Sequence, residues 1–151
     1  MKILGIRTAP TVVRYAILDW NGNNTVFVNA NAENKLDFPA GISNSAAKLH
    51  WLYQELERIL RQNPTIERIA IKINEYGRVD SITTRDAAYL DAIVLLIAEE
   101  KTIPIEMLMY KSIGTNRNKV KSYSQSICGL STNYWNEQIA DAIAVASAVR
   151  N

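Results

Sequence analysis

The chain opens with Met1-Lys-Ile-Leu-Gly-Ile-Arg7 and continues, after Pro10, with Val12-Val-Arg-Tyr-Ala-Ile-Leu18. Both stretches are short and rich in aliphatic, β-branched or aromatic side chains, which favours strands. A third stretch, Thr25-Val-Phe-Val-Asn29, follows Asn21-Gly-Asn-Asn24, a sequence that suits a hairpin turn. The opening therefore predicts three consecutive strands, joined by short connections into an antiparallel meander.

Helices and strands alternate after this meander. The polar stretch Asn31–Ser43 contains proline and glycine, so we expect a loop there. The elements that follow are predicted from apolar periodicity and from capping and breaking residues: a helix over Ser45–Gln62, a strand over Ile66–Ile73, a helix capped by Thr83 or Thr84, a strand over Ile103–Met109, and helices over Thr115–Ile127 and Asn136–Arg150. The order β-β-β-α-β-α-β-α-α predicts an α/β fold, with a five-stranded mixed sheet and helices on both faces. This order is similar to that of the ribonuclease H-like fold.

Length and composition are those of one globular domain. The chain has 151 residues, of which 48% are hydrophobic and 21% charged, so we expect a single domain over residues 1–151. No apolar run approaches the roughly 20 residues of a bilayer span, and the opening does not resemble a signal peptide. We therefore expect a cytoplasmic protein with no membrane association. One cysteine and one histidine exclude an internal disulfide and the common Cys/His zinc sites.

Four parts of the sequence, taken together, resemble the RuvC family of Holliday-junction resolvases. That family's first strand and return strand match Met1–Arg7 and Tyr15–Asp19, and its fourth strand matches Ile69–Lys72. Its last helix matches Ile139–Ala146, and the glycine-containing loop and basic helix that precede the last helix match Lys111–Ser122. The four parts occur in the family's order and spacing and cover nearly the whole chain.

The resemblance also implies where the family's catalytic residues would fall. RuvC-like nucleases need four carboxylates that converge on two divalent cations, which hold the attacking and leaving oxygens of a phosphodiester. The family's first-strand aspartate falls on Arg7 and its fourth-strand glutamate on Lys72. The two acids of its last helix fall on Gln138 and Asp141. One of the four acids is therefore present.

Two of these replacements put a cation where the family has an anion. Positive charges at Arg7 and Lys72 would strongly repel Mg²⁺ at short range. A lone carboxylate at Asp141 is then expected to pair with Arg7 or Lys72 rather than with a metal. We therefore expect no catalytic residue, no metal and no cofactor in a degenerate site formed by Arg7, Lys72, Gln138 and Asp141.

A basic segment lies between the last predicted strand and the last helix. Four cations occur within eleven residues, with no acid among them and a tyrosine on either side: Lys111, Arg117, Lys119 and Lys121. This pattern suits phosphate contacts with occasional base stacking. Arg7 and Lys72 would extend the basic surface and could hold an anion if they faced the same cleft. A solvated helix face explains the pattern equally well, because the net charge is only +2.

Three functions remain open from the sequence. The first is a non-catalytic RuvC-like module that binds structured DNA or RNA, or a protein of a nucleic-acid complex; the resemblance also implies a homodimer. The second is a metal-dependent nuclease in which a displaced cluster of Glu75, Glu137 and Asp141 binds Mg²⁺. Against it, Glu75 suits a turn and Glu137 suits the first turn of a helix, where the helix dipole favours an acid. The third is a regulatory interaction protein with no nucleic-acid contact.

Overall fold

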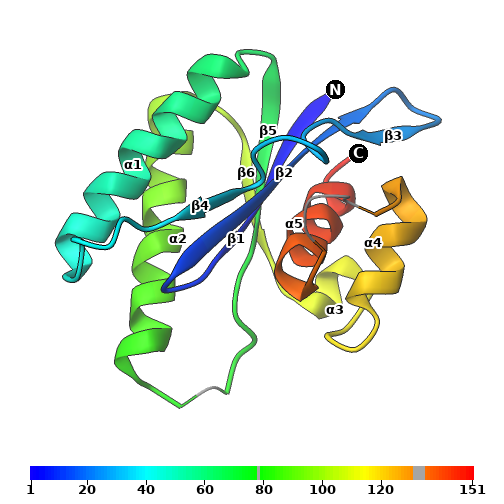
Figure 1. The fold of residues 1–151 in the computed structure, drawn as a ribbon. Helices are drawn as coiled ribbons and strands as arrows, with labels where there is room; N and C mark the ends of the chain where they lie inside the picture. Colours follow the sequence, from blue (N-terminus) through cyan, green and yellow to red (C-terminus); the bar gives the residue numbers. More distant parts are fainter. Residues whose placement is uncertain (78, 131–134) are drawn as a thin grey trace.

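The structure is a computed structural model that describes residues 1–77, 79–130 and 135–151. One mixed sheet lies between helices on both of its faces (Figure 1). The strands are β1 (Lys2–Thr8), β2 (Val12–Trp20), β3 (Thr25–Phe27), β4 (Lys35–Asp37), β5 (Ile66–Lys72) and β6 (Ile105–Leu108). The helices are α1 (Ser45–Gln62), α2 (Ile82–Glu100), α3 (Tyr110–Ile113), α4 (Val120–Cys128) and α5 (Glu137–Ala148).

The sheet order is β3-β2-β1-β5-β6, and β4 also pairs with β2. Strand β1 is antiparallel to β2 and parallel to β5, and β6 continues the parallel side. The predicted mixed α/β architecture is confirmed, and all five predicted strands are present. The loop expected over 31–43 contains a sixth, short strand, β4. It pairs with β2 because Leu36 in its centre lies opposite Val13 and is buried with it.

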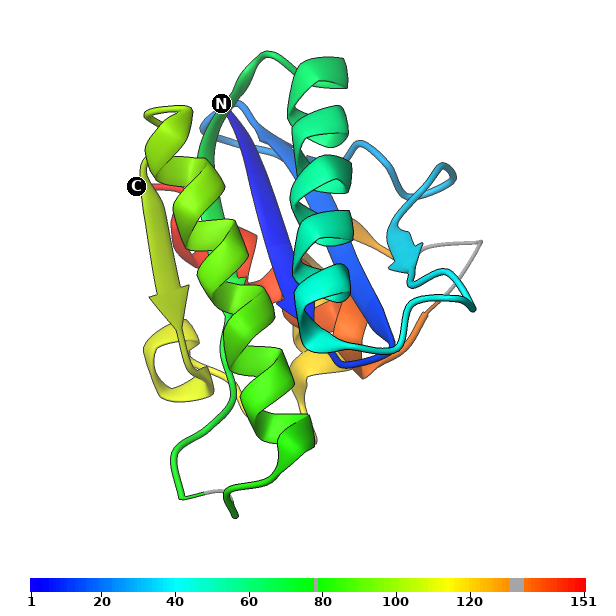
Figure 2. The same ribbon diagram turned by 90° about the vertical axis from the view of Figure 1, so that its left-hand side faces the viewer.

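The two faces of the sheet carry side chains of different size. One face bears large aliphatic residues such as Leu4 and Ile6 and packs against α1 and α2 (Figure 2). The other face bears Ile3 and Gly5 and packs against α5, with α4 packed on α5 (Figure 1). The division follows from the alternation of side chains along β1.

Helix α5 lies close to the sheet because the strand residues beneath it are small. Gly5 is paired with Ala16 on β2 and with Ala70 on β5. A Cβ atom added to Gly5 would lie 1.9 Å from the backbone oxygen of Ala142. No side chain fits in this contact, so the backbone of α5 is held directly over the centre of β1. Asp141, one residue earlier in α5, is thereby held against the sheet.

Side-chain caps set the starts of the three long helices. The side chains of Asn44 and Asn136 each accept from the backbone N–H three residues on, at the starts of α1 and α5. Helix α2 begins earlier than predicted, because Ser81 is its N-cap and forms a capping box with Thr84; neither Thr83 nor Thr84 is the cap. None of the helices in the described ranges is long and apolar enough to cross a membrane.

The basic segment does not form the single helix predicted over Thr115–Ile127. The chain first forms the one-turn helix α3, which ends at Gly114 with a φ of 90°. It then turns, and the Asn116 side chain accepts from the backbone N–H of Lys119, so α4 begins only at Val120. Asparagine competes with helical hydrogen bonds in this way, which is why it favours turns.

Candidate functional site

Two cations and one acid meet where the sheet passes under the first half of α5. Arg7 lies two residues beyond Gly5 on β1, and Lys72 lies two residues beyond Ala70 on β5. Because side chains alternate along a strand, both cations are on the face that α5 covers. Asp141 reaches the same place from α5. Three of the four positions that match the family's acids are thus brought together. Gln138, the fourth, is half-buried one turn earlier.

Arg7 is held by groups of its own chain. Its Nε lies 3.3 Å from Oδ2 of Asp141, its Nη1 donates to the backbone carbonyl of Lys72 at 2.9 Å, and its Nη2 donates to Oδ1 of Asn74 at 2.9 Å. The side chain is 19% exposed. The expected pairing of Asp141 with one of the two cations is therefore observed. The guanidinium fixes the end of β5, and each of its three nitrogens faces a group of its own chain.

Lys72 is buried, with 1% of its side chain exposed. Its Nζ lies 3.0 Å from Oε1 of Glu75 and 4.0 Å from the ring centroid of Tyr110. Burial lowers the pKa of the Lys72 ammonium, and the neighbouring Arg7 lowers it too, whereas Glu75 raises it. The sequence left open that Lys72 could extend an anion-binding surface. The burial of Lys72 and its pairing with Glu75 argue against that interpretation.

Tyr110 connects the two ion pairs. Its hydroxyl donates to Oδ1 of Asp141 at 2.7 Å, and its backbone N–H donates to Oε1 of Glu75 at 2.9 Å. Burial raises the pKa of the Asp141 carboxyl, while Tyr110 and Arg7 oppose that rise. Burial also acts to raise the pKa of Glu75, but the Tyr110 N–H and Lys72 together bring it below its ordinary value. We call this network the central charge cluster: Arg7, Lys72, Glu75, Tyr110 and Asp141.

Sequence reasoning does not identify all of these residues. Tyr110 is present there only as one of the two tyrosines that flank the basic segment, and Asn74 is not singled out. Arg14 is also missed: it lies across from Arg7 in the β1–β2 register and is 5% exposed. The available signal is its position two residues before Ala16, which puts it on the face under α5.

The donor set of the central charge cluster does not fit two divalent cations. Mg²⁺ requires oxygen ligands around it, but both acids of the cluster already neutralise cations of this chain. Asp141 faces Arg7 and Glu75 faces Lys72. In residues 1–77, 79–130 and 135–151, no group of three or more His, Cys, Asp or Glu side chains could hold a metal ion.

The displaced cluster of Glu75, Glu137 and Asp141 is divided among separate cationic partners. Glu137 lies 2.9 Å from Nε of Arg117, which belongs to the basic segment and approaches α5 from outside. Glu75 and Asp141 belong to the central charge cluster. Each of the three acids therefore has its own cation, an arrangement that favours ion pairing over joint metal coordination.

The cations of the basic segment are all exposed, and we call them the basic rim: Lys111, Arg117, Lys119 and Lys121. The Arg117–Glu137 pair is itself solvated, with 65% and 38% of the two side chains exposed. In the part of the chain that the structure describes, no acid lies within ion-pair distance of the three lysines. Their charges are therefore available to an external anion.

Another buried acid, Asp91 on α2, lies on the opposite face of the sheet. The hydroxyl of Thr8 donates to its Oδ1 at 2.5 Å. Asp91 is 9% exposed. Burial raises the pKa of Asp91 to about 6, against the opposing effects of the Thr8 hydrogen bond and of Arg7 and Lys72. Asp91 thus differs from Asp141, since it has a hydroxyl rather than a guanidinium beside it.

Solved structures share this arrangement of sheet and helices. Thermus thermophilus RuvC superposes with a TM-score of 0.78 and 15% sequence identity, over 98% of this chain and 92% of that chain. The chain has a RuvC-like fold. T. thermophilus RuvC in complex with Holliday junction substrate also has a TM-score of 0.78, at 14% identity over the same shares of the two chains. The yeast mitochondrial Holliday junction resolvase has a TM-score of 0.57 at 15% identity, over 97% of this chain and 76% of that chain.

The RuvC-like fold confirms the resemblance that the four sequence parts indicate. Neither the protein-family models nor the curated proteins contain a match to this chain. At such low identity the likeness to RuvC concerns the fold, so the chemistry of this chain has to be argued from its own side chains.

Proposed function

We propose that this chain is a non-catalytic RuvC-like protein that binds structured nucleic acid without a divalent metal. The observation that carries the proposal is the ion pair between Arg7 and Asp141. Two-metal phosphodiester hydrolysis needs carboxylate oxygens that converge on the metals. Here Asp141 is committed to a guanidinium, and the buried Lys72 adds a second positive charge beside it.

The fold and the distribution of charge both support nucleic acid as the ligand. One solved structure of similar fold is a RuvC in complex with Holliday junction substrate. The lysines of the basic rim are exposed, and lysine–phosphate contacts gain free energy by releasing counterions. Tyr76, in the loop that follows β5, is 84% exposed and can stack on an unpaired base. Arg7 and Lys72 contact acids of their own chain, which supports an internal role for these two cations.

The proposal is tested with labelled four-way-junction and duplex DNA. Binding and cleavage are measured with EDTA, with Mg²⁺ and with Mn²⁺, each at two salt concentrations. We expect binding to persist in EDTA, to weaken as salt rises, and to be stronger for the junction than for the duplex. We expect no cleavage products with either metal.

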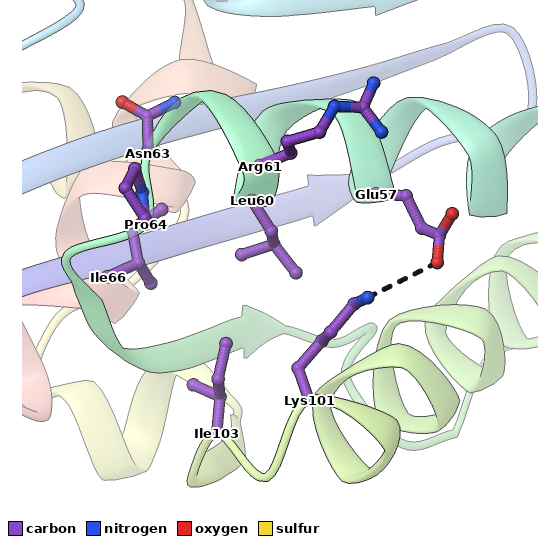
Figure 3. Close-up of a pocket in the computed structure, with 8 residues that line it drawn as sticks. All are labelled: Glu57, Leu60, Arg61, Asn63, Pro64, Ile66, Lys101 and Ile103. Atoms are coloured by element: carbon purple, nitrogen blue, oxygen red, sulfur yellow. Dashed lines mark ion pairs between the residues drawn. The ribbon is translucent and has the colours of Figure 1, made fainter.

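A matched pair of double variants tests whether the basic rim is the contact surface. The double variant Lys119→Glu with Lys121→Glu is expected to lower junction affinity at least tenfold. The slope of log affinity against log salt is expected to fall in magnitude by about 0.9 for each phosphate that the variant no longer neutralises. The control, Arg61→Glu with Lys101→Glu, makes the same change of charge at the opposite end of the sheet. These two cations line a pocket of about 430 Å³ between the ends of α1 and α2 (Figure 3).

Two results would replace this proposal by an alternative. Metal-dependent cleavage that Asp141→Asn abolishes would show that the carboxylates Glu75, Glu137 and Asp141 rearrange around a metal. Absence of binding to both DNA forms at low salt would favour a regulatory protein that contacts only other proteins.

We extend the proposal to a homodimer, because a two-fold assembly presents equal surfaces to the arms of a symmetric junction. Light scattering after gel filtration, at protein concentrations a hundredfold apart, is expected to give the mass of two chains. The mass of one chain at every concentration would contradict this part of the proposal.

A further inference from the structure

A groove between α2 and β6 lies outside the basic rim, although Tyr76 also lines it. Its volume is about 430 Å³, and it opens where β5 ends. One wall is a face of α2 formed by Ala88, Ala92 and Leu95, which recur at the spacing of one helix face. The other wall includes Met107 of β6, which is 48% exposed. The walls are therefore apolar and open to solvent.

The strand beside this groove has a free edge. Strand β6 is the last strand of the sheet on its side and pairs only with β5 among the described strands (Figure 2). The backbone carbonyl of Pro104 accepts from Ile69 on β5, and that of Leu108 accepts from Ile73, which follows β5. Because backbone groups alternate along a strand, those of Ile105 and Met107 point away from β5, toward the free edge. A free edge of this kind can accept a further strand.

The floor of the groove is acidic. Asp91 and Glu75 both line it, together with the amide of Asn74. Oε1 of Glu75 contacts Lys72 and the Tyr110 N–H, and the side chain is 36% exposed. Asp91 accepts from Thr8 through Oδ1. Glu75 is already neutralised by Lys72, so Asp91 supplies the negative charge of the lining. This charge is opposite in sign to that of the basic rim, so the groove suits a cationic side chain rather than a phosphate.

We propose that the groove and the free edge of β6 bind an extended segment of a partner protein, in which an apolar and a basic side chain stand two residues apart. The segment adds to β6 as a further strand, with its backbone paired to Ile105 and Met107. Side chains two residues apart point to the same face of a strand. The apolar one packs on Ala92 and Leu95, and the basic one reaches Asp91 on the floor. This inference stands whether or not the chain binds nucleic acid.

Two synthetic peptides test the proposal directly. The probe is Thr-Val-Thr-Lys-Thr-Val-Thr with blocked ends, and the comparison peptide has Glu in place of Lys. We expect the lysine peptide to bind at least tenfold more tightly in a fluorescence-anisotropy titration. We also expect it to slow hydrogen exchange at the amides of Ile105 and Met107, since these N–H groups become bonded.

Variants of the groove separate this contact from the rest of the molecule. Met107→Pro removes an outward N–H without removing a bond to β5 and is expected to weaken the lysine peptide at least tenfold. Asp91→Asn is expected to reduce the preference for lysine over glutamate. Leu96→Ala is the control, because this side chain is 49% exposed but does not line the groove. Junction binding is expected to be unchanged in all three variants.

Three results would overturn the proposal. Equal binding of the two peptides would mean that the acidic floor does not select the ligand. No binding at a peptide concentration of about 1 mM would exclude strand addition by such a segment. In the third result, the amides of Ile105 and Met107 become protected from hydrogen exchange as protein concentration rises, and the mass doubles. This would mean that a second copy of this chain covers the edge.

Discussion

The central charge cluster and the basic rim contain the same kinds of cation in opposite surroundings. Lys72 is 1% exposed and neutralised by Glu75, whereas Lys119 and Lys121 lie on the surface. Arg7 is held by Asp141, whereas Arg117 forms its ion pair in solvent. The residue type is therefore a poor guide to role in this protein.

The difference shows what burial does to a cation. A buried charge loses its hydration and is tolerated only when groups of the same chain replace that hydration. Such groups then leave no capacity for an external ligand. An exposed charge keeps its water and can exchange it for a phosphate at small cost. We therefore propose that Arg7 and Lys72 stabilise the fold and that the exposed lysines contribute to binding.

The largest expected effect comes from removing the acid of a buried pair. Asp141→Ala leaves Arg7 and the Tyr110 hydroxyl without their shared acceptor, in a place where Asp141 is 1% exposed. Breaking a buried pair in this way costs about 3–5 kcal/mol of unfolding free energy. Urea denaturation monitored by circular dichroism measures the loss. A loss no greater than that of a surface substitution would mean that the pair does not stabilise the fold.

The buried acid Asp91 extends the comparison to a buried negative charge. The pKa of Asp91 is raised from 3.8 to about 6 in the folded state. Its carboxyl therefore binds a proton more tightly when folded, so the folded state loses stability as pH rises from about 4 to about 6 and stays lower above that. The two-unit shift corresponds to up to about 3 kcal/mol.

Asp91→Asn isolates this effect, because the amide carries no charge at any of these pH values. We expect Asp91→Asn to gain stability relative to the unchanged chain between pH 4.5 and pH 7.5. Urea unfolding at the two pH values gives the difference. An equal difference at both would show that Asp91 does not titrate in this range.

Acids introduced at the positions that match the RuvC pattern are expected to convert the cluster from ion pairs toward a metal site. The triple variant Arg7→Asp, Lys72→Glu, Gln138→Asp puts four acids at the matching positions. We expect it to be less stable in EDTA, because like charges repel, and to be stabilised by Mg²⁺. At a Mg²⁺ concentration ten times the Kd, the gain is about 1.4 kcal/mol. Thermal unfolding with and without Mg²⁺ measures it, and the unchanged chain is the control.

The smallest expected effect belongs to the exposed ion pair. Arg117 and Glu137 are 65% and 38% exposed, so solvent screens their attraction. Arg117→Ala is expected to leave the urea midpoint unchanged within error and to weaken junction binding by less than the Lys119/Lys121 double variant. A clear loss of stability would place Arg117 with the buried cations and weaken the distinction between the central charge cluster and the basic rim.

Several features of the cluster could be predicted from the sequence. The strands at residues 2–7 and 12–18 follow from local apolar pattern. The pairing of Asp141 with one of the two cations, Arg7 or Lys72, follows from the charges at the positions that match the RuvC pattern, and the structure shows that the partner is Arg7. The short strand β4 could not be predicted, because three residues in a polar stretch carry too little signal. Nor could the position of Tyr110, which depends on β6 lying beside β5.

The sequence by itself determined the class of fold and the positions of the charges, since both depend on local pattern and on residue identity. Only the tertiary structure decided which charges are buried. Lys72 is predicted in an apolar strand and Lys119 in a polar segment, but neither position by itself shows that α5 covers the sheet face that carries Lys72. That cover exists because Gly5 admits the α5 backbone at Ala142, a contact between residues far apart in the chain. No local pattern contains such a contact, so the local sequence alone does not determine which cation is buried.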